Sequence, residues 1–191
     1  MNEIIQSIIH YDQNLFLELN GTNTPVLDTV MLWITNKYTW IPMYILLIGL
    51  TIREQKGKAY IFLLVAISAV GLADYITSGI MKPYFERFRP CHEPMLSGLV
   101  HVVGKCGGNY GFASSHASTS FALATIFLLT FRKKQPFIWI LSIWAILYSY
   151  SRIYVGVHYP ADILIGASFG IISGLVGFQV YIKILQKYHR N

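Results

Sequence analysis

Long apolar stretches separated by short polar connections dominate the sequence. They occupy residues 38–52, 59–81, 113–131, 136–150 and 161–185. A helix needs about 20 apolar residues to cross a bilayer core, and an open sheet edge cannot be satisfied in lipid. The pattern therefore predicts an all-α integral membrane protein, a helical bundle of about five to six transmembrane helices.

The first apolar stretch is short for a span. The amphipathic residues 26–36 extend it backwards, and Asn36 and Lys37 interrupt it, which predicts a broken or kinked helix. Pro42 lies inside the stretch and adds to the expected kink, because proline removes a helical hydrogen bond and crowds the preceding turn.

The N-terminal segment, residues 1–25, mixes apolar and polar positions. Residues 1–19 place Ile4, Ile8 and Phe16 among polar neighbours, and a turn-forming cluster follows at 20–25. This pattern is typical of an amphipathic helix lying in the membrane interface. It has neither the basic n-region nor the small-residue cleavage site of a signal peptide. In an alternative interpretation the first 36 residues contain a further crossing, which gives six spans and an N-terminus on the inner side.

Composition supports a membrane protein. Of the 191 residues, 54% are hydrophobic and 13% are charged, and the mean hydropathy is +0.47. Soluble domains carry about 25% charged residues, so this chain has too few for an ordinary soluble globule, a coiled coil or a disordered chain. The length fits a single membrane-embedded domain over residues 1–191.

The positive charge is grouped along the chain. Basic groups that flank spans mark cytoplasmic ends and are poor indicators of nucleic-acid binding. We therefore expect a multi-pass protein of the bacterial-type cytoplasmic (inner) membrane, with the N-terminal helix, the loop 82–112 and the connection 151–160 on the extracytoplasmic, or periplasmic, face. The net charge is +6, and nine of the 15 Lys and Arg residues follow apolar stretches in three groups: Arg53, Lys56 and Lys58; Arg132, Lys133 and Lys134; Lys183, Lys187 and Arg190.

Three polar stretches meet the predicted extracytoplasmic face. Ionisable residues at membrane depth are costly and by default indicate a functional site. Lysine and arginine suit phosphate oxygens, two histidines can divide the roles of nucleophile and general acid, and a carboxylate can orient an imidazole. The side chains are Lys82 and Arg89 in the loop, Ser114, Ser115 and His116 at the start of the third long stretch, and Arg152, His158 and Asp162 around the last connection.

The spacing of these residues favours phosphoryl transfer. Asp162 follows His158 by four residues, about one helical turn, which lets the carboxylate hold an imidazole N–H. Fixed cations can neutralise charge on the equatorial phosphate oxygens. The sequence contains no H-E-x-x-H motif, no G-x-x-x-x-G-K-[ST] loop and no Cys/His ligand spacing, so we expect neither a metal site nor a cofactor.

Three motifs in order resemble those of the type 2 phosphatidic acid phosphatase superfamily. Residues 82–90 and 151–162 match its Lys-x6-Arg-Pro and Ser-Arg-x5-His-x3-Asp motifs. Residues 113–116, Ala-Ser-Ser-His, resemble its Pro-Ser-Gly-His motif, with alanine for proline and serine for glycine. The resemblance covers roughly residues 59–185 and implies the haloperoxidase-like helical bundle of that family.

The resemblance also implies a role for each motif residue. His158 attacks phosphorus and forms a phosphohistidine, Asp162 orients and activates His158, and His116 protonates the leaving lipid oxygen. Such enzymes need no metal and act on lipid phosphates presented at the bilayer surface. The phosphate oxygens are bound by Lys82, Arg89 and Arg152, with help from Ser114 and a backbone N–H near Ser115. Ser115 can replace glycine in this way if the turn there is already helical.

We therefore expect a membrane lipid-phosphate phosphatase that hydrolyses a phosphomonoester or a diphosphate. The family suggests polyprenyl diphosphate, phosphatidylglycerophosphate, phosphatidic acid or lipid A phosphate as the substrate. A lipid phosphotransferase would use the same intermediate, and a non-catalytic anionic-lipid binding or transport protein would need the cations but not both histidines. Membrane lipids are the other expected partners, nucleic acid is not, and monomer and homodimer both remain open.

An acidic residue before the loop and two cysteines within it allow two further predictions. Asp74 shares a helix face with Ser78 and Lys82, which favours a supporting role for its carboxylate over direct catalysis. Cys91 and Cys106 both lie in the loop 82–112, where an extracytoplasmic compartment permits a disulfide, and two free thiols are the alternative.

The remaining polar loop residues are expected to be solvated. They are Arg87, Lys105, His92 and His101, and either histidine could instead line the mouth of the pocket. The last apolar stretch contains small residues at Gly166-x3-Gly170-x3-Gly174, a spacing that permits close helix packing. We expect this packing inside the bundle, with dimerisation as the alternative.

Overall fold

The computed structural model describes residues 3–190, and the regular structure in this range is helical. Between Phe88 and Tyr110 the chain also forms an isolated antiparallel bridge. The main helices are α1 (Glu3–Gly21), α2 (Pro25–Thr35), α3 (Ile41–Gln55), α4 (Ala59–Asp74), α5 (Lys82–Phe85), α6 (Ser115–Phe131), α7 (Ile140–Tyr154) and α8 (Pro160–Arg190). Short 3-10 helices are η1 (Lys37–Trp40), η2 (Lys56–Lys58), η4 (Pro90–His92), η5 (Pro94–Leu96) and η6 (Pro136–Trp139), and η3 (Tyr75–Met81) is a π-helix.

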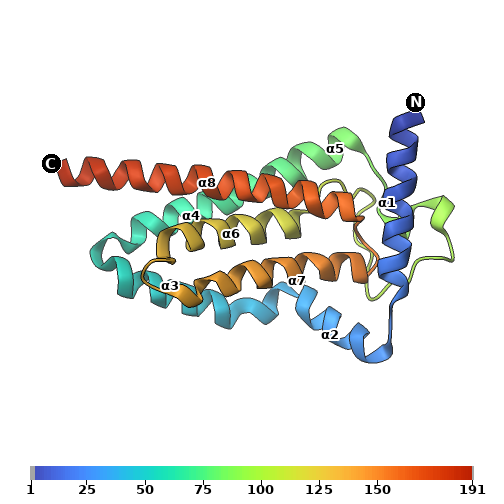
Figure 1. Cartoon of the computed structure of the whole chain (residues 1–191), viewed down its shortest axis with the longest axis horizontal. Helices are drawn as coiled ribbons and strands as arrows, with labels where there is room; N and C mark the ends of the chain where they lie inside the picture. Colours follow the sequence, from blue (N-terminus) through green and yellow to red (C-terminus); the bar gives the residue numbers. More distant parts are fainter. Residues whose placement is uncertain (1–2, 191) are drawn as a thin grey trace.

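Each apolar stretch predicted as a span overlaps one of α3, α4, α6, α7 and α8, and η1, η3 and η6 hold part of three of the stretches. By length and composition, three helical segments of the described chain could cross a membrane: Lys37–Phe85, Pro136–Tyr154 and Pro160–Tyr188. The first of them turns back at η2, so that α3 and α4 lie side by side in the bundle (Figure 1). α6 is an apolar helix of 17 residues with no short helix continuing it, so it is shorter than these three continuous segments. The all-helical bundle expected from the sequence is confirmed.

The predicted break before α3 is present, but Pro42 does not cause it. α2 ends at Thr35, and the Asn36 side chain accepts a hydrogen bond from the Tyr38 N–H. Trp40 Nε1 donates to the Ile34 carbonyl oxygen at 2.8 Å, which satisfies a carbonyl that the break frees. Pro42 lies in the first turn of α3, where a helix has no use for its missing N–H. Pro42 therefore begins a helix and does not kink one.

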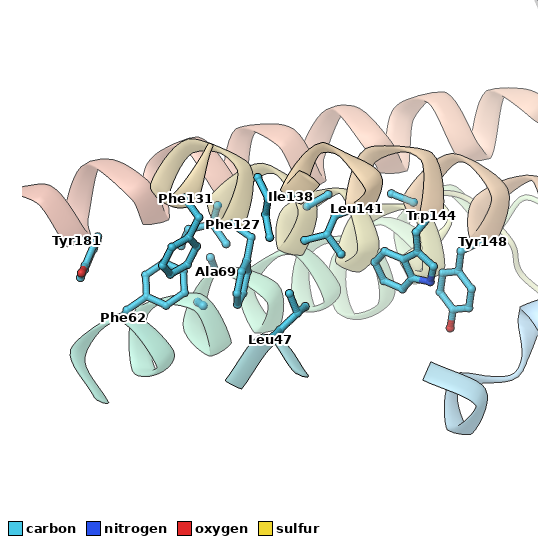
Figure 2. Close-up of a cluster of buried hydrophobic side chains, with 14 of the residues drawn as sticks. Leu47, Phe62, Ala69, Phe127, Phe131, Ile138, Leu141, Trp144, Tyr148 and Tyr181 are labelled. Atoms are coloured by element: carbon cyan, nitrogen blue, oxygen red, sulfur yellow. The ribbon is translucent and has the colours of Figure 1, made fainter. Parts of the chain in front are cut away.

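A cluster of aromatic and aliphatic side chains fills the bundle between α3, α4, α6, α7 and α8. Phe62 contacts Phe127, Phe131 and Tyr181 edge to face, with ring centroids 5.0–5.2 Å apart. Such pairs add about 0.5–1.5 kcal/mol each to the gain from burial. Figure 2 shows this group at one end of the cluster and the Trp144 and Tyr148 rings side by side at the other.

The glycine series of α8 packs inside the bundle, against α6. A Cβ at Gly166 would fall against the Ser114 carbonyl oxygen, and one at Gly170 against the Ser118 carbonyl oxygen. At Gly174 the nearest atom would be Thr125 Cβ, at 2.7 Å. The expectation of close packing within the bundle is confirmed, and this packing sets the position of the first turn of α6.

We predict that Gly170→Ala destabilises the protein by about 1–3 kcal/mol, the usual range for overpacking. The new methyl group would meet backbone on α6, which cannot move aside as a side chain can. The midpoint of thermal unfolding in detergent measures the effect. Gly49→Ala on α3 is the matched control, because a Cβ there meets nothing within 4 Å. Equal midpoints for both variants would contradict the packing argument.

α1 crosses the end of the bundle instead of running along it (Figure 1). Its buried residues are Asp12, Phe16 and Asn20, while Ile4 and Ile8 stay exposed. Phe16 packs edge to face on Tyr159, with ring centroids 5.4 Å apart. The amphipathic helix expected here therefore has an inner face that contacts the bundle and an outer apolar face.

The predicted loop 82–112 contains three short helices. Its first four residues form α5, and η4 and η5 follow. Asn20 holds the loop to the bundle, because its side chain accepts the His101 N–H at 2.8 Å and donates to the Tyr154 carbonyl oxygen at 2.8 Å. The loop is thus fixed against α1 and the end of α7.

Candidate active site

The three polar motifs come together at the end of the bundle that α1 crosses. Lys82 begins α5, Ser115 and His116 begin α6, and the third motif runs from the end of α7 into the start of α8. Figure 1 shows α5, the start of α6, the end of α7 and the start of α8 at this same end of the bundle. The Lys82 Nζ lies 3.3 Å from the Ser115 Oγ, which links the first two motifs directly.

His158 and Asp162 form a buried pair between α7 and α8. The His158 Nδ1 lies 3.2 Å from the Asp162 Oδ2, and the Tyr159 N–H donates to the same oxygen at 3.0 Å. Side-chain exposure is 2% for His158 and 0% for Asp162. An Nδ1–H held by the carboxylate leaves Nε2 as the basic, nucleophilic nitrogen of the ring.

The local chain sequence explains how this pair is placed. Gly156 adopts a φ of +83°, and a Cβ there would lie 2.8 Å from the His101 carbonyl oxygen. This turn ends α7 and lets the N–H groups of Val157 and His158 both donate to the Arg152 carbonyl oxygen. Pro160 then begins α8, so that Asp162 lies in its first turn, where the helix dipole favours a carboxylate.

The environment of His158 keeps its imidazole neutral. Burial lowers the pKa of His158 well below its ordinary value, and the positive charges of Arg152 and Arg89 act in the same direction. A neutral imidazole has a free lone pair, which a nucleophile requires. The lowered pKa therefore favours the uncharged ring at neutral pH, the form that the predicted role of nucleophile requires.

The cations predicted to bind phosphate are held by their neighbours in different ways. Arg89 donates from Nη1 to the Cys106 carbonyl oxygen at 2.8 Å and from Nε to the Tyr110 carbonyl oxygen at 3.2 Å. Arg152 donates from Nη1 to the Thr35 Oγ1 at 2.6 Å. Both guanidinium groups are thereby oriented by groups outside the three motifs.

Two buried polar atoms of the site lack a partner within residues 3–190. They are the Arg152 Nε and the Ser114 Oγ, and the Ser114 residue has no exposed surface. Buried polar groups are otherwise almost always hydrogen-bonded. Donors left free beside the buried His158 are the arrangement that an anion such as phosphate can satisfy.

His116 lies on the first turn of α6, stacked on Tyr148 with ring centroids 5.1 Å apart. It lines a cavity of about 750 Å³ together with Ser115 and Asp74. The rest of the cavity wall is mostly apolar and comes from α3, α4, α6 and α7, with Lys37 of η1 as one further charged side chain. It includes Leu47, Leu63, Ala66, Phe127 and Trp144. His116 thus stands where the polar site meets an apolar space.

Asp74, Ser78 and Lys82 form a chain of hydrogen bonds, which fits the expectation that they share a face. The Ser78 Oγ donates to the Asp74 Oδ1 at 3.1 Å and accepts from the Lys82 Nζ at 3.3 Å. The carboxylate therefore reaches the lysine through a hydroxyl. This arrangement suits a supporting role for Asp74.

Cys91 and Cys106 are joined in a disulfide bond. Together with His92 they are close enough to resemble a metal site, but sulfurs bonded to each other are not thiolate ligands. The bond lies beside the Cys106 carbonyl oxygen that orients Arg89. It therefore supports the part of the site that holds Arg89.

The expectation of a solvated Arg87 is wrong. Its guanidinium forms ion pairs with Asp12 at 2.7 Å and with Asp162 at 2.9 Å, and lies 3.9 Å above the Tyr159 ring. No sequence pattern links residues that are 75 positions apart, so the sequence did not indicate that Asp12 and Arg87 belong to the site. The sequence reading also missed Gly111, where a Cβ would lie 3.2 Å from the Asp162 Oδ2.

The loop histidines and Lys105 differ from one another. His92 and Lys105 are exposed, as expected. His101 is only partly exposed, and its Nε2 lies 2.9 Å from the Asp28 Oδ1, which also accepts from the Tyr154 hydroxyl at 2.7 Å. His101 therefore fastens the loop to α2 and α7 and is not simply solvated.

Known proteins are similar to this chain in both sequence and fold. The PAP2 superfamily profile matches residues 59–185. The lipid A 4'-phosphatases of Porphyromonas gingivalis and Bacteroides thetaiotaomicron are 37% and 35% identical, over 93% of this chain and 76% and 79% of their own lengths. The crystal structure of Aquifex aeolicus LpxE superposes with a TM-score of 0.68 at 27% identity, over 87% of this chain and 93% of that one. The chain belongs to the PAP2 superfamily of membrane lipid-phosphate phosphatases.

Proposed function

We propose that this protein removes a phosphate group from lipid A on the extracytoplasmic face of the membrane, through a phosphohistidine at His158. The observation that carries the chemistry is the buried His158–Asp162 pair, together with two buried donors that have no partner in the described part of the chain, the Arg152 Nε and the Ser114 Oγ. The substrate class comes from the relatives, since two lipid A 4'-phosphatases match 93% of the chain at 35–37% identity. Two matching undecaprenyl-diphosphatases, from Sulfolobus acidocaldarius and Bacillus subtilis, are 28% and 31% identical over 90% and 86% of it.

The reaction divides into two displacements at phosphorus. In the first, the His158 Nε2 forms a bond to phosphorus while the bond to the lipid oxygen breaks, and His116 gives that oxygen a proton. In the second, water attacks the phosphohistidine, His116 takes a proton from the water, and the N–P bond breaks to release phosphate. Asp162 holds the Nδ1–H throughout. Lys82, Arg89 and Arg152 neutralise the equatorial oxygens, where charge stabilisation contributes most.

The apolar cavity supports a lipid as the leaving group. His116 lines it, so an oxygen that His116 protonates belongs to a molecule whose apolar part can extend between α3, α4, α6 and α7. A water-soluble phosphate ester would gain nothing from that apolar wall. The burial of hydrocarbon contributes about 0.8 kcal/mol for each methylene group.

The charge distribution supports an extracytoplasmic site. The basic groups lie at the α3–α4 turn, the α6–α7 turn and the last part of α8, and Figure 1 places these at the end of the bundle opposite to α1. Positive residues that flank spans stay on the cytoplasmic side. The end that carries α1 and the motifs then faces away from the cytoplasm.

Phosphate release from a panel of lipids, measured with purified protein in EDTA, tests the proposal. The panel holds bisphosphorylated lipid A, undecaprenyl diphosphate, phosphatidylglycerophosphate and phosphatidic acid. We expect kcat/KM to be about tenfold or more higher for lipid A, since tenfold requires only 1.4 kcal/mol of added recognition. The lipid product should have lost one phosphate by mass. A higher kcat/KM for undecaprenyl diphosphate would refute the lipid A assignment, and activity that EDTA abolishes and Mg²⁺ restores would refute the metal-free scheme.

A further inference from the structure

Arg87 connects two buried carboxylates from opposite ends of the chain. Its Nη1 donates to the Asp162 Oδ1 at 2.9 Å, and its Nη2 donates to the Asp12 Oδ2 at 2.7 Å. The side chain is 23% exposed, while those of Asp12 and Asp162 are 9% and 0% exposed. Ion pairs so far from water are stronger and more rigid than surface pairs.

The contacts of Asp162 show what Arg87 does for the site. The Oδ2 atom is the one that holds His158 Nδ1 and the Tyr159 N–H. Arg87 takes the other oxygen, so the carboxylate is held on both sides and its plane is fixed. The Tyr159 ring beneath the guanidinium, 3.9 Å away, limits the movement of Arg87 in turn.

Asp12 anchors the same arrangement from α1. Its Oδ2 holds Arg87, and its Oδ1 accepts the N–H of Ala161, the residue before Asp162, at 2.9 Å. A displacement of α1 would therefore disturb both the guanidinium and the start of α8. This couples the N-terminal helix to the His158–Asp162 pair.

We propose that Arg87 is a positioning residue for phosphoryl transfer, which orients Asp162 and through it the His158 nucleophile, and that Asp12 of α1 holds Arg87 in place. Arg87 differs from the cations assigned to phosphate, because both of its terminal nitrogens are already committed to carboxylates. The proposal rests on the phosphohistidine chemistry proposed above. It does not depend on which lipid is the substrate.

The decisive experiment compares Arg87→Gln, Arg87→Lys and Asp12→Asn with the wild type, on whichever lipid phosphate the wild type hydrolyses. We expect Arg87→Gln to lower kcat about 100-fold, the usual cost of misplacing a reacting group by about 1 Å, while KM changes less than threefold. Asp12→Asn should lower kcat about tenfold. In the double variant the loss should match that of Arg87→Gln alone, because Asp12 acts through Arg87.

The pH profile of kcat separates orientation from charge. Lys82 on α5, Arg89 in the loop, Arg152 on α7 and His116 on α6 also face His158 and stay unchanged in every variant. Loss of the Arg87 charge makes protonation of the His158–Asp162 pair easier, so the acid limb should move to higher pH in Arg87→Gln. Arg87→Lys keeps the charge without the two-carboxylate fork, so its kcat should fall while the acid limb stays within about 0.3 units.

A control variant and three results would decide whether Arg87 positions Asp162. Lys105→Gln removes an exposed cation from the same loop and should leave kcat unchanged. An unchanged kcat in Arg87→Gln, or a rise in KM alone, would overturn the proposal, the second because it would make Arg87 a substrate ligand. A lower unfolding midpoint with an unmoved pH profile would show a merely structural role and would also overturn it.

If Arg87→Gln does not fold, Asp12→Asn and Arg87→Lys decide by the same criteria. A wild type that hydrolyses some other lipid phosphate would contradict only the lipid A assignment.

Discussion

His158→Ala is expected to abolish lipid-phosphate hydrolysis, with a loss of about 10⁴- to 10⁶-fold in kcat, as when other enzymes lose their nucleophile. Without the imidazole no covalent intermediate forms, and the cations alone only bind the phosphate. Phosphate release measures the loss. Brief incubation of the wild type with ³²P-labelled lipid, followed by alkaline quench, should trap label that is stable in base and labile in acid, and the variant should trap none.

The matched control for this prediction is His92→Ala. His92 is an exposed loop histidine whose Nε2 lies 3.2 Å from the Gly107 carbonyl oxygen. Its removal should leave kcat within twofold of the wild type. Base-stable label on His158→Ala, or activity close to that of the wild type, would rule out His158 as the nucleophile. Because His158 is nearly fully buried, the unfolding midpoint must be measured alongside to show that the variant is folded.

His116→Ala is expected to lower kcat for a lipid phosphate by about 10²- to 10⁴-fold, the usual contribution of a general acid. The size of the loss should depend on the leaving group. An alkoxide needs a proton as it departs, whereas p-nitrophenolate does not. With p-nitrophenyl phosphate the burst of the first turnover should therefore be slowed less than tenfold in the variant.

The leaving-group dependence makes this prediction specific to acid catalysis. A loss of the same size for both substrates would mean that His116 binds phosphate or supports the fold through its stacking on Tyr148. His10→Ala on α1 serves as the control, since His10 is an exposed histidine. That variant should hydrolyse both substrates at the rate of the wild type.

Local spacing carried the sequence-based predictions that agree with the structure. His158 and Asp162 are four residues apart, and Asp74 and Ser78 are separated in the same way, so a single helical turn brings each pair into contact. The break after Thr35 follows equally from neighbouring residues. The effect expected of Pro42 differs from the structure because α3 begins at Ile41, one residue before the proline. Where a helix begins depends on contacts with other helices, which the helix propensities of single residues do not include.

The contacts of Arg87 could not be predicted from neighbouring residues in the sequence. Asp12, Arg87 and Asp162 are 75 residues apart at each step, and a loop arginine without its partners looks like any solvated charge. Gly111 is similar, since a Cβ there would lie 3.2 Å from the Arg89 Cγ and the Asp162 Oδ2 and 3.5 Å from the His158 Nδ1, which makes the position tight for a side chain. Distances of this kind arise when α1, the loop and α8 pack on one another.

The amino-acid sequence by itself determined that this is a helical membrane protein and that the motifs at 82–90, 113–116 and 151–162 belong to one face of the membrane. The length of an apolar stretch, the position of charges and a spacing of one helical turn are all properties of residues that are neighbours in the sequence. The tertiary structure alone decided how those motifs are held. It left the Arg152 Nε and the Ser114 Oγ without hydrogen-bond partners among residues 3–190, formed a mostly apolar cavity next to His116, and joined α1 to Arg87 of the site through Asp12. The physical reason is that burial and pairing depend on which surfaces of the bundle come into contact, and this is fixed only when the helices pack.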